Sequence, residues 1–139
     1  MQTILLVDDE PDILKTLEDL LGQSGYTIVS KLDAESALSV IREGMQIDLV
    51  ITDLRMPGMS GSELTTILRK MLPSVPIIML TGHGSVETYL KSMSSGVFEY
   101  VNKPVQVREL RRIVKTALEW SKAKKIRQDH DSRRNIQGS

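Results

Sequence analysis

Four short apolar runs of this 139-residue chain each lead directly into residues with acidic, hydroxyl or basic side chains. The runs and the residues that follow or end them are 4–7 with Asp8 and Asp9, 49–52 with Asp53, 75–80 with Thr81, and 100–102 with Lys103. Runs this short, rich in Val, Ile and Leu and bounded by polar residues, are typical of strands buried on both faces. If the strands are parallel, their carboxyl ends lie side by side, where open α/β sheets bind ligands. The sequence therefore predicts one crevice that collects these side chains.

Three carboxylates in one crevice repel one another, and this repulsion constrains what the site can be. Two unit charges about 4 Å apart repel by roughly 4 kcal/mol at an effective dielectric constant near 20. A hard divalent cation with oxygen ligands and a nearby lysine would offset the repulsion. Asp8, Asp9, Asp53 and Lys103 therefore predict a Mg²⁺ site built for a phosphoryl group.

Helix-like segments alternate with the strand-like runs, which is the pattern of βα units around a parallel sheet. Pro11 suits the first turn of a helix, and Asp33 is a plausible N-cap of the next one. Further strands are expected over residues 26–29 and 98–101, and a fourth helix over residues 86–93. The last helix is predicted from an apolar stripe at helical spacing, and it has no clear stop at Trp120. The stripe consists of Val107, Leu110, Val114 and Ala117.

Composition sets further limits. The content of 40% hydrophobic and 26% charged residues is ordinary for a soluble globular domain, and the absence of Cys excludes disulfides and thiolate sites. We find no signal peptide and no apolar run of the roughly 18 residues that a membrane span needs, so a cytoplasmic location is expected. Residues 1–120 carry 12 Lys and Arg against 16 Asp and Glu, whereas residues 121–139 carry six against two. A basic tail can touch nucleic acid, but more often it is a solvated linker or a frayed helix end.

Together these segments resemble the response-regulator receiver domain of two-component signalling, the chemotaxis-regulator-like phospho-acceptor domain. The motifs that carry the resemblance are Leu6-Val7-Asp8-Asp9-Glu10, Asp53-Leu54-Arg55-Met56-Pro57-Gly58-Met59-Ser60-Gly61, Leu80-Thr81-Gly82 and Tyr100-Val101-Asn102-Lys103-Pro104. They occur in the family's order and spacing and cover about residues 2–120. The resemblance implies a flavodoxin-like, doubly wound α/β fold. Its five-stranded parallel sheet would have the strand order 2-1-3-4-5, with helices on both faces. The receiver domain is expected over residues 1–120, followed by a basic tail or linker over 121–139.

The resemblance also implies a role for each residue of the acidic cluster. Asp53 would be the phospho-acceptor, loaded from the phosphohistidine of a sensor histidine kinase or phosphotransfer protein. Asp9 would bind Mg²⁺ directly and Asp8 through water. Asp53 and the backbone carbonyl of Arg55 would complete the protein ligands of the metal.

Three further positions match the residues that sense the phosphoryl group in this family. Lys103 would contact a phosphoryl oxygen, and its peptide bond to Pro104 would be cis. Thr81 would be the switch hydroxyl, which bonds the phosphoryl group and shifts with it. Tyr100 would turn inward when Thr81 moves. The alternatives without a signalling role are that Thr81 is an ordinary threonine at a strand end and that Tyr100 is a half-buried tyrosine on an edge strand.

These assignments predict a signalling switch that controls a downstream output, and transcription is one candidate for that output. The protein would catalyse only its own phosphorylation and dephosphorylation, so it is not expected to be an enzyme acting on a separate substrate. We expect the readout at the surface of the fourth helix, the fifth strand and the last helix. Phosphorylation-dependent homodimerisation would use this surface, and the receiver domain itself would not bind nucleic acid.

The sequence leaves other functions open, with less support. The strongest alternative is a phosphorylation-independent interaction module with the same fold, against which the quartet of Asp9, Asp53, Thr81 and Lys103 argues. A metal-dependent phosphohydrolase would want a second acid–base carboxylate beside Asp53, and none stands two residues on. A flavodoxin-like electron carrier would need a Ser/Thr-rich loop after the first strand, and nucleotide binding would need a P-loop pattern. His83 is expected to be a loop residue that tunes water access rather than a metal ligand.

Overall fold

A computed structural model describes residues 1–82 and 96–137, with side chains as far as Arg127. Its centre is a five-stranded sheet with the order β2-β1-β3-β4-β5, in which every neighbouring pair is parallel. The strands are β1 (Thr3–Val7), β2 (Thr27–Lys31), β3 (Leu49–Asp53), β4 (Ile77–Thr81) and β5 (Glu99–Asn102). The flavodoxin-like fold and the strand order 2-1-3-4-5 are therefore confirmed.

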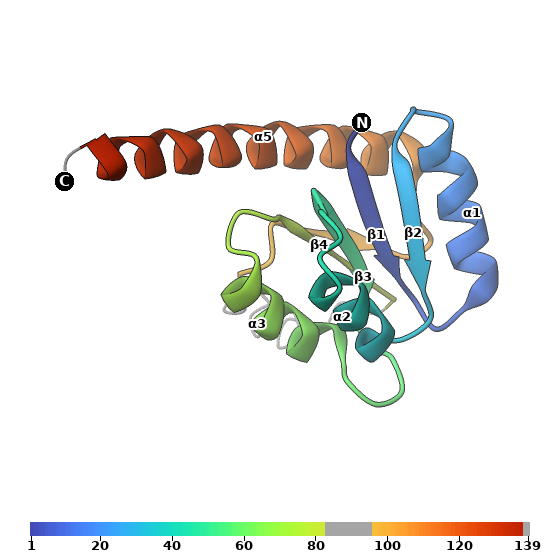
Figure 1. Ribbon diagram of the computed structural model, residues 1–139. Coiled ribbons are helices and arrows are strands. Elements are labelled where there is room, and N and C mark those ends of the chain that lie inside the picture. The colour runs from blue at the N-terminus through green and yellow to red at the C-terminus, as the bar shows by residue number, and fades with distance from the viewer. Residues whose placement is uncertain (83–95, 138–139) are drawn as a thin grey trace.

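Helices cover both faces of the sheet (Figure 1). The described helices are α1 (Pro11–Gly22), α2 (Ala34–Arg42), α3 (Gly61–Met71) and α5 (Val107–Gln137). α1 and α5 pack on one face, and α2 and α3 pack on the other. The predicted fourth helix over residues 86–93 lies outside the described residues, as does His83.

Local sequence signals explain where these helices begin. Pro11 occupies the first turn of α1, where its missing N–H breaks no helical hydrogen bond. The Asp33 carboxylate accepts a hydrogen bond from the Ser36 N–H at 2.7 Å, as the N-cap prediction requires. The Ser60 hydroxyl caps α3 in the same way, accepting from the Glu63 N–H at 3.2 Å.

Strand alternation divides the aliphatic core into two layers. Along β1, Ile4 and Leu6 face α1 and α5, while Leu5 and Val7 face α2 and α3. β3 and β4 are buried along their whole length, because they lie in the middle of the sheet with helices above and below. The sheet is therefore a rigid platform whose carboxyl edge carries the polar residues.

Some element boundaries differ from the sequence prediction, for identifiable reasons. β4 begins at Ile77 rather than at Val75, because the Val75 N–H is bonded to the Leu72 carbonyl in the preceding turn at 3.1 Å. Val107 was expected in the buried stripe of the last helix, but it is 42% exposed at the first position of α5. The rest of the stripe, Leu110, Val114 and Ala117, is fully buried.

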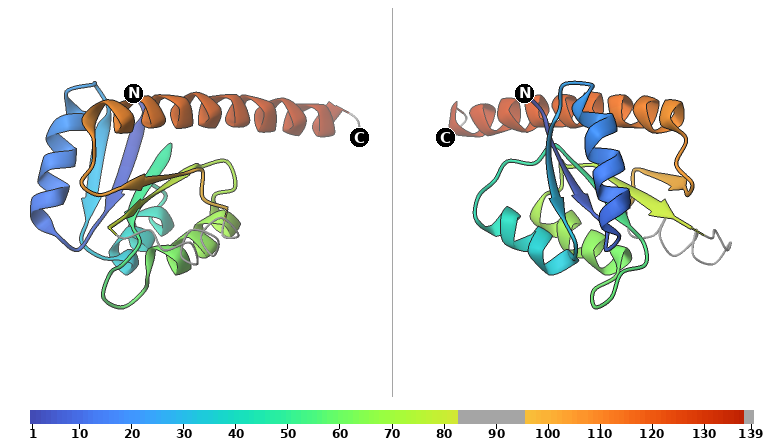
Figure 2. Two further views of the ribbon diagram at one scale, coloured as in Figure 1. Left: turned by 180° about the vertical axis from the view of Figure 1, so that it is seen from behind. Right: turned by 90° about the vertical axis from the view of Figure 1, so that its right-hand side faces the viewer.

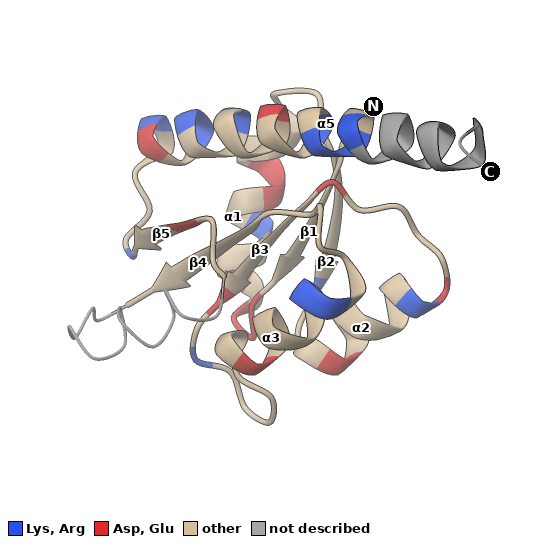
Figure 3. Cartoon of the chain, turned by 90° about the vertical axis from the view of Figure 1, so that its left-hand side faces the viewer, with Lys and Arg blue, Asp and Glu red and all other residues tan. Residues whose placement is uncertain are grey.

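α5 continues far beyond the sheet and carries most of the basic tail (Figures 1, 2 and 3). Trp120 lies near the middle of the helix, with its ring centroid 5.8 Å from that of Phe98. Further along the helix, Lys125 forms an ion pair with Asp48 in the connection before β3. Asp48 also accepts a hydrogen bond from the Thr3 N–H at 2.8 Å, so it links the starts of β1 and β3 to α5. Among the described residues, no helix is both long and apolar enough to cross a membrane.

Candidate functional site

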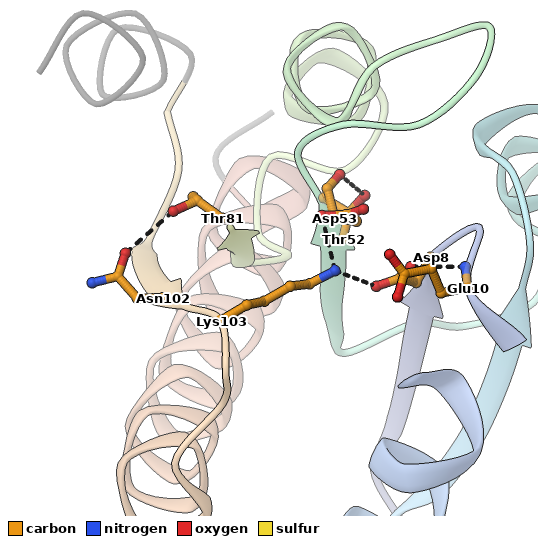
Figure 4. Close-up of polar contacts among 7 residues, drawn as sticks. All are labelled: Asp8, Glu10, Thr52, Asp53, Thr81, Asn102 and Lys103. Carbon is orange, nitrogen blue, oxygen red and sulfur yellow. Dashed lines mark hydrogen bonds and ion pairs between the residues drawn. The ribbon is translucent and has the colours of Figure 1, made fainter. Parts of the chain in front are cut away.

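The carboxyl ends of β1, β3, β4 and β5 bring the predicted site residues to one edge of the sheet (Figure 4). A pocket of about 220 Å³ opens there, lined by Asp9, Glu10, Asp53, Leu54, Arg55, Gly82 and Lys103. A larger cavity of about 470 Å³ lies elsewhere, and among the described residues that line it Lys125 is the one with a charged side chain. The smaller pocket is therefore the better candidate for charge-dependent chemistry.

Lys103 joins two carboxylates that are far apart in the sequence. Its Nζ lies 3.0 Å from Asp8 Oδ2 and 3.3 Å from Asp53 Oδ1. Both aspartates are buried, with relative exposures of 1% for Asp8 and 6% for Asp53. Buried carboxylates of this kind require a partner, and the ammonium group supplies it to both at once.

The backbone around the first strand fixes the orientation of the acidic pair. The Asp8 N–H donates to the Lys31 carbonyl of β2 at 3.1 Å, which continues the sheet by one residue. Asp8 Oδ1 accepts the Glu10 N–H at 2.9 Å, and Oδ2 faces Lys103. Asp9, in contrast, is exposed and lines the pocket. The two adjacent aspartates therefore have different surroundings, one held by the protein and the other open to solvent.

The electrostatics of the site favour a proton or a cation beside Asp53. Burial raises the pKa of Asp53 above its ordinary value, and the Asp8 carboxylate raises it further. Lys103 acts in the opposite direction but does not outweigh these two effects. Burial by itself would lower the pKa of Lys103, yet the hydrogen bond and charge of Asp8, together with Asp53, hold it above its ordinary value. One ammonium group thus compensates the cluster only in part.

The oxygen atoms of the cluster are arranged so that a metal ion could be held. Asp8, Asp9 and Asp53 each offer a carboxylate oxygen, and these atoms lie within 4.8 Å of one another. An all-oxygen set with few carboxylates fits Mg²⁺, which keeps several of its own waters. Arg55 is exposed and lines the same pocket, so its segment borders the acidic cluster.

The two predicted switch residues occupy neighbouring strands. Thr81 is 5% exposed at the end of β4, and its hydroxyl donates to Asn102 Oδ1 at 3.2 Å. In Figure 4 the Thr81 hydroxyl points towards Asn102 and away from Asp53. Tyr100 is half-buried on β5, two residues before Asn102. The Lys103–Pro104 peptide bond, which follows β5, is cis, as the resemblance implies.

Sequence reasoning assigned no specific role to two residues beside the site. Asn102 contacts Thr81, and the only signal for this was its place at the end of the last strand. Gly61, at the start of α3, lies so close to β3 that a β-carbon there would be 2.2 Å from the Asp53 carbonyl oxygen. Each contact joins residues of two different secondary-structure elements, so no local sequence pattern reveals it.

The 2-1-3-4-5 sheet and the acidic cluster at its carboxyl edge define a flavodoxin-like α/β domain with its site outside the strand ends. Within this class, the chain belongs to the response regulator receiver domain family, whose sequence profile matches residues 4–115. This confirms the resemblance to the receiver domains of two-component response regulators.

Individual relatives agree with the family assignment. The chain is 39% identical over 118 residues to the transcriptional regulatory protein GlrR of Escherichia coli, which covers 85% of this chain and 26% of that protein. It is 38% identical over 123 residues to the response regulator protein PilR of Pseudomonas aeruginosa, covering 84% of this chain and 26% of that one. The chain thus spans about a quarter of the length of these curated relatives.

Solved structures show the same fold. A response regulator receiver domain protein from Clostridium thermocellum superposes with a TM-score of 0.83 at 33% identity, covering 88% of this chain and 98% of that one. NtrX from Brucella abortus, solved in complex with ADP, superposes with a TM-score of 0.84 at 32% identity. That match covers 97% of this chain and 30% of NtrX.

Proposed function

We propose that this chain is a phosphorylation-activated switch whose phospho-acceptor is Asp53. The observation that carries the proposal is the convergence of Asp53, Asp8 and Lys103, with Lys103 Nζ within 3.3 Å of both carboxylates. Asp53 also lines an open pocket, so a phosphodonor can reach it. A buried pair with a purely structural role would need neither the pocket nor the exposed second carboxylate of Asp9.

The donor would be the phosphohistidine of a sensor histidine kinase or a phosphotransfer protein. A carboxylate oxygen of Asp53 would attack the phosphorus, forming an O–P bond as the P–N bond of the phosphohistidine breaks. The electron pair of the broken bond returns to the imidazole nitrogen. Lys103, already beside Asp53, would pair with a phosphoryl oxygen and so offset the negative charge that arrives.

Mg²⁺ is the cofactor that the residues of the site fit. Asp9, Asp53 and the backbone carbonyl of Arg55 would hold it, with Asp8 acting through water. The bound ion would neutralise charge on the phosphoryl oxygens. Asp9 suits direct binding because it is exposed in the pocket, whereas Asp8 is already held by Lys103 and the Glu10 N–H.

Output would follow from a two-state equilibrium that the phosphoryl group biases through Thr81 and Tyr100. Two of the relatives are named as a transcriptional regulatory protein and a response regulator, and both are about four times as long as the matched segment. We therefore extend the proposal to the receiver part of a system that controls transcription. The chain would catalyse its own phosphorylation and dephosphorylation without acting on a separate substrate.

Dimerisation would be one way to transmit the phosphorylated state. Beyond Trp120, Ile126 is 62% exposed, and the distal half of α5 leaves the sheet (Figure 2). A helix that loses its apolar face gains little from packing on its own domain, so this part of α5 would persist either as a solvated extension or by pairing with another chain. Sedimentation with and without Mg²⁺ and beryllofluoride would test this. A single monomeric species at high micromolar concentration in both conditions would exclude dimerisation and leave partner binding through the same surface.

The experiment that tests the function uses acetyl phosphate and Mg²⁺ as phosphodonor and cofactor. Intact-mass measurement should find one added phosphoryl group that is labile to base and hydroxylamine, as an acyl phosphate must be. Asp53→Asn should take up none, and Glu63→Gln, on the exposed side of α3, is a matched control that should react like wild type. Stable phosphate on a Ser or Thr, with Asp53 unmodified, would contradict the proposal and favour the phosphorylation-independent interaction module.

A further inference from the structure

The hydroxyl of Thr81 already has a partner in the structure, and that partner is neither Asp53 nor Lys103. Thr81 Oγ1 lies 3.2 Å from Asn102 Oδ1. The two residues are opposite one another in the parallel pairing of β4 and β5. Figure 4 shows the hydroxyl turned to the side of the sheet where Asn102 lies, away from the carboxylate of Asp53.

A second hydrogen bond ties the same two strands together at this point. The Lys103 N–H donates to the Thr81 carbonyl at 2.8 Å, as the parallel ladder requires. Thr81 is therefore held to β5 by its backbone and by its side chain. The backbone bond can persist while the hydroxyl rotates, whereas the side-chain bond cannot.

A threonine hydroxyl has one proton to donate. The proposed switch requires that Thr81 give this proton to a phosphoryl oxygen on Asp53, so its bond to Asn102 must break first. The two bonds exclude each other and therefore define two positions of one side chain. Asn102 is exposed, so its amide can bond to water after the hydroxyl has left.

We propose that Asn102 is a positioning residue that holds the Thr81 hydroxyl in the resting position and so opposes activation. This inference rests on the proposed function, because it assigns a partner to the same switch residue. Removing the Asn102 amide should favour the position of Thr81 that the phosphorylated state requires. The substitution removes a hydrogen bond of the resting position, and it removes no hydrogen bond of the active position. Neutral hydrogen bonds of this kind shift an equilibrium by roughly two- to tenfold.

The test is the affinity for beryllofluoride at saturating Mg²⁺, measured by titration calorimetry on the full chain. Asn102→Leu keeps the approximate size of the side chain and removes the acceptor. It should bind the mimic about two- to tenfold more tightly than wild type. Glu99→Gln is the matched control, since Glu99 is exposed on the same strand and its carboxylate accepts the Tyr100 N–H at 3.2 Å rather than contacting Thr81. Its affinity should equal that of wild type.

A double-mutant cycle with Thr81→Val separates an effect that passes through the Thr81–Asn102 hydrogen bond from a general effect of Asn102→Leu. Without the hydroxyl, Asn102→Leu should no longer change the affinity for beryllofluoride. An equal gain in the Thr81→Val background would overturn the inference, because the effect would not pass through the hydroxyl. If Asn102→Leu binds beryllofluoride no more tightly than wild type, while wild type binds it normally, the positioning role of Asn102 is wrong and the proposed phosphorylation switch is unaffected. Failure of wild type to bind the mimic would instead remove the proposed function itself.

Discussion

Replacing Gly61 by alanine should damage both the stability of the domain and the position of the phospho-acceptor. A β-carbon at this position would lie 2.2 Å from the Asp53 carbonyl oxygen, 2.9 Å from Met79 Sδ and 3.0 Å from Leu54 Cα. Heavy atoms essentially never approach a β-carbon within 3.0 Å, so the Asp53 carbonyl would have to recede by about 0.8 Å. That oxygen belongs to the backbone of a central, fully buried strand, which cannot swing aside as a flexible side chain would.

The size of the effect follows from two opposing contributions. Overpacking of a well-packed core costs typically 1–3 kcal/mol, and a clash between two backbone segments belongs at the upper end of this range. Alanine in place of glycine in a helix recovers at most about 0.5–1 kcal/mol. The net loss of unfolding free energy should be about 2 kcal/mol, which corresponds to a fall in Tm of roughly 6–10 °C for a domain of this size.

Thermal and urea denaturation measure the stability change directly, and Gly22→Ala is the matched control. Gly22 ends α1, and no described residue outside its own helix and chain neighbours places an atom within 4 Å of an added β-carbon, so its substitution should leave the Tm unchanged or slightly raised. Phosphorylation of Gly61→Ala by acetyl phosphate, at a temperature where the variant is folded, should fall on the order of tenfold or more, because Asp53 is displaced. A Tm at or above that of wild type would refute the reasoning that the contact is rigid.

Three further outcomes follow from the charges of the site and of α5. In chelator, Asp53→Asn should raise the free energy of unfolding at pH 7. Because the pKa of Asp53 is raised in the native state, ionisation of Asp53 destabilises the native state as the pH rises above the ordinary pKa of 3.8. The stability gained by Asp53→Asn should therefore disappear near and below pH 3.8. No gain in stability at neutral pH would contradict this prediction. Millimolar Mg²⁺ should raise the Tm of wild type by native-state binding and should not do so for Asp9→Ala, whereas an unchanged wild-type Tm would count against the metal site. Lys125→Met should lower the free energy of unfolding by at most about 1 kcal/mol, because its ion pair with Asp48 is partly exposed. Asp48→Ala should lower it by more, because this change also removes the hydrogen-bond acceptor of the Thr3 N–H. Equal urea midpoints for the Lys125 and Asp48 variants would show that the bond to Thr3 contributes nothing.

The sequence alone was sufficient for the class of fold and for most of the residues that meet at the candidate site. Strands buried on both faces appear as continuous apolar runs, and Asp53, Thr81 and Lys103 each stand at or directly after the end of one. Helix starts were also readable, since Pro11 and the Asp33 cap act within a single turn of chain. Boundaries were less accurate where a turn competes for a backbone donor, as at Val75.

The contacts across the site were decided only by the tertiary structure. Lys103 and Asp8 are separated by 95 positions, and the sheet order determines that one ammonium group reaches both Asp8 and Asp53. The bond between Thr81 and Asn102 depends on the register of β4 against β5.

The same division holds at α5. Its apolar stripe is a local pattern, but the anchoring of the helix by Lys125 to Asp48, 77 positions away, is not. Periodicity fixes which face of a segment is buried, because side-chain direction repeats along a strand or helix. It cannot fix which distant polar groups meet, because that depends on strand order, register and helix placement together.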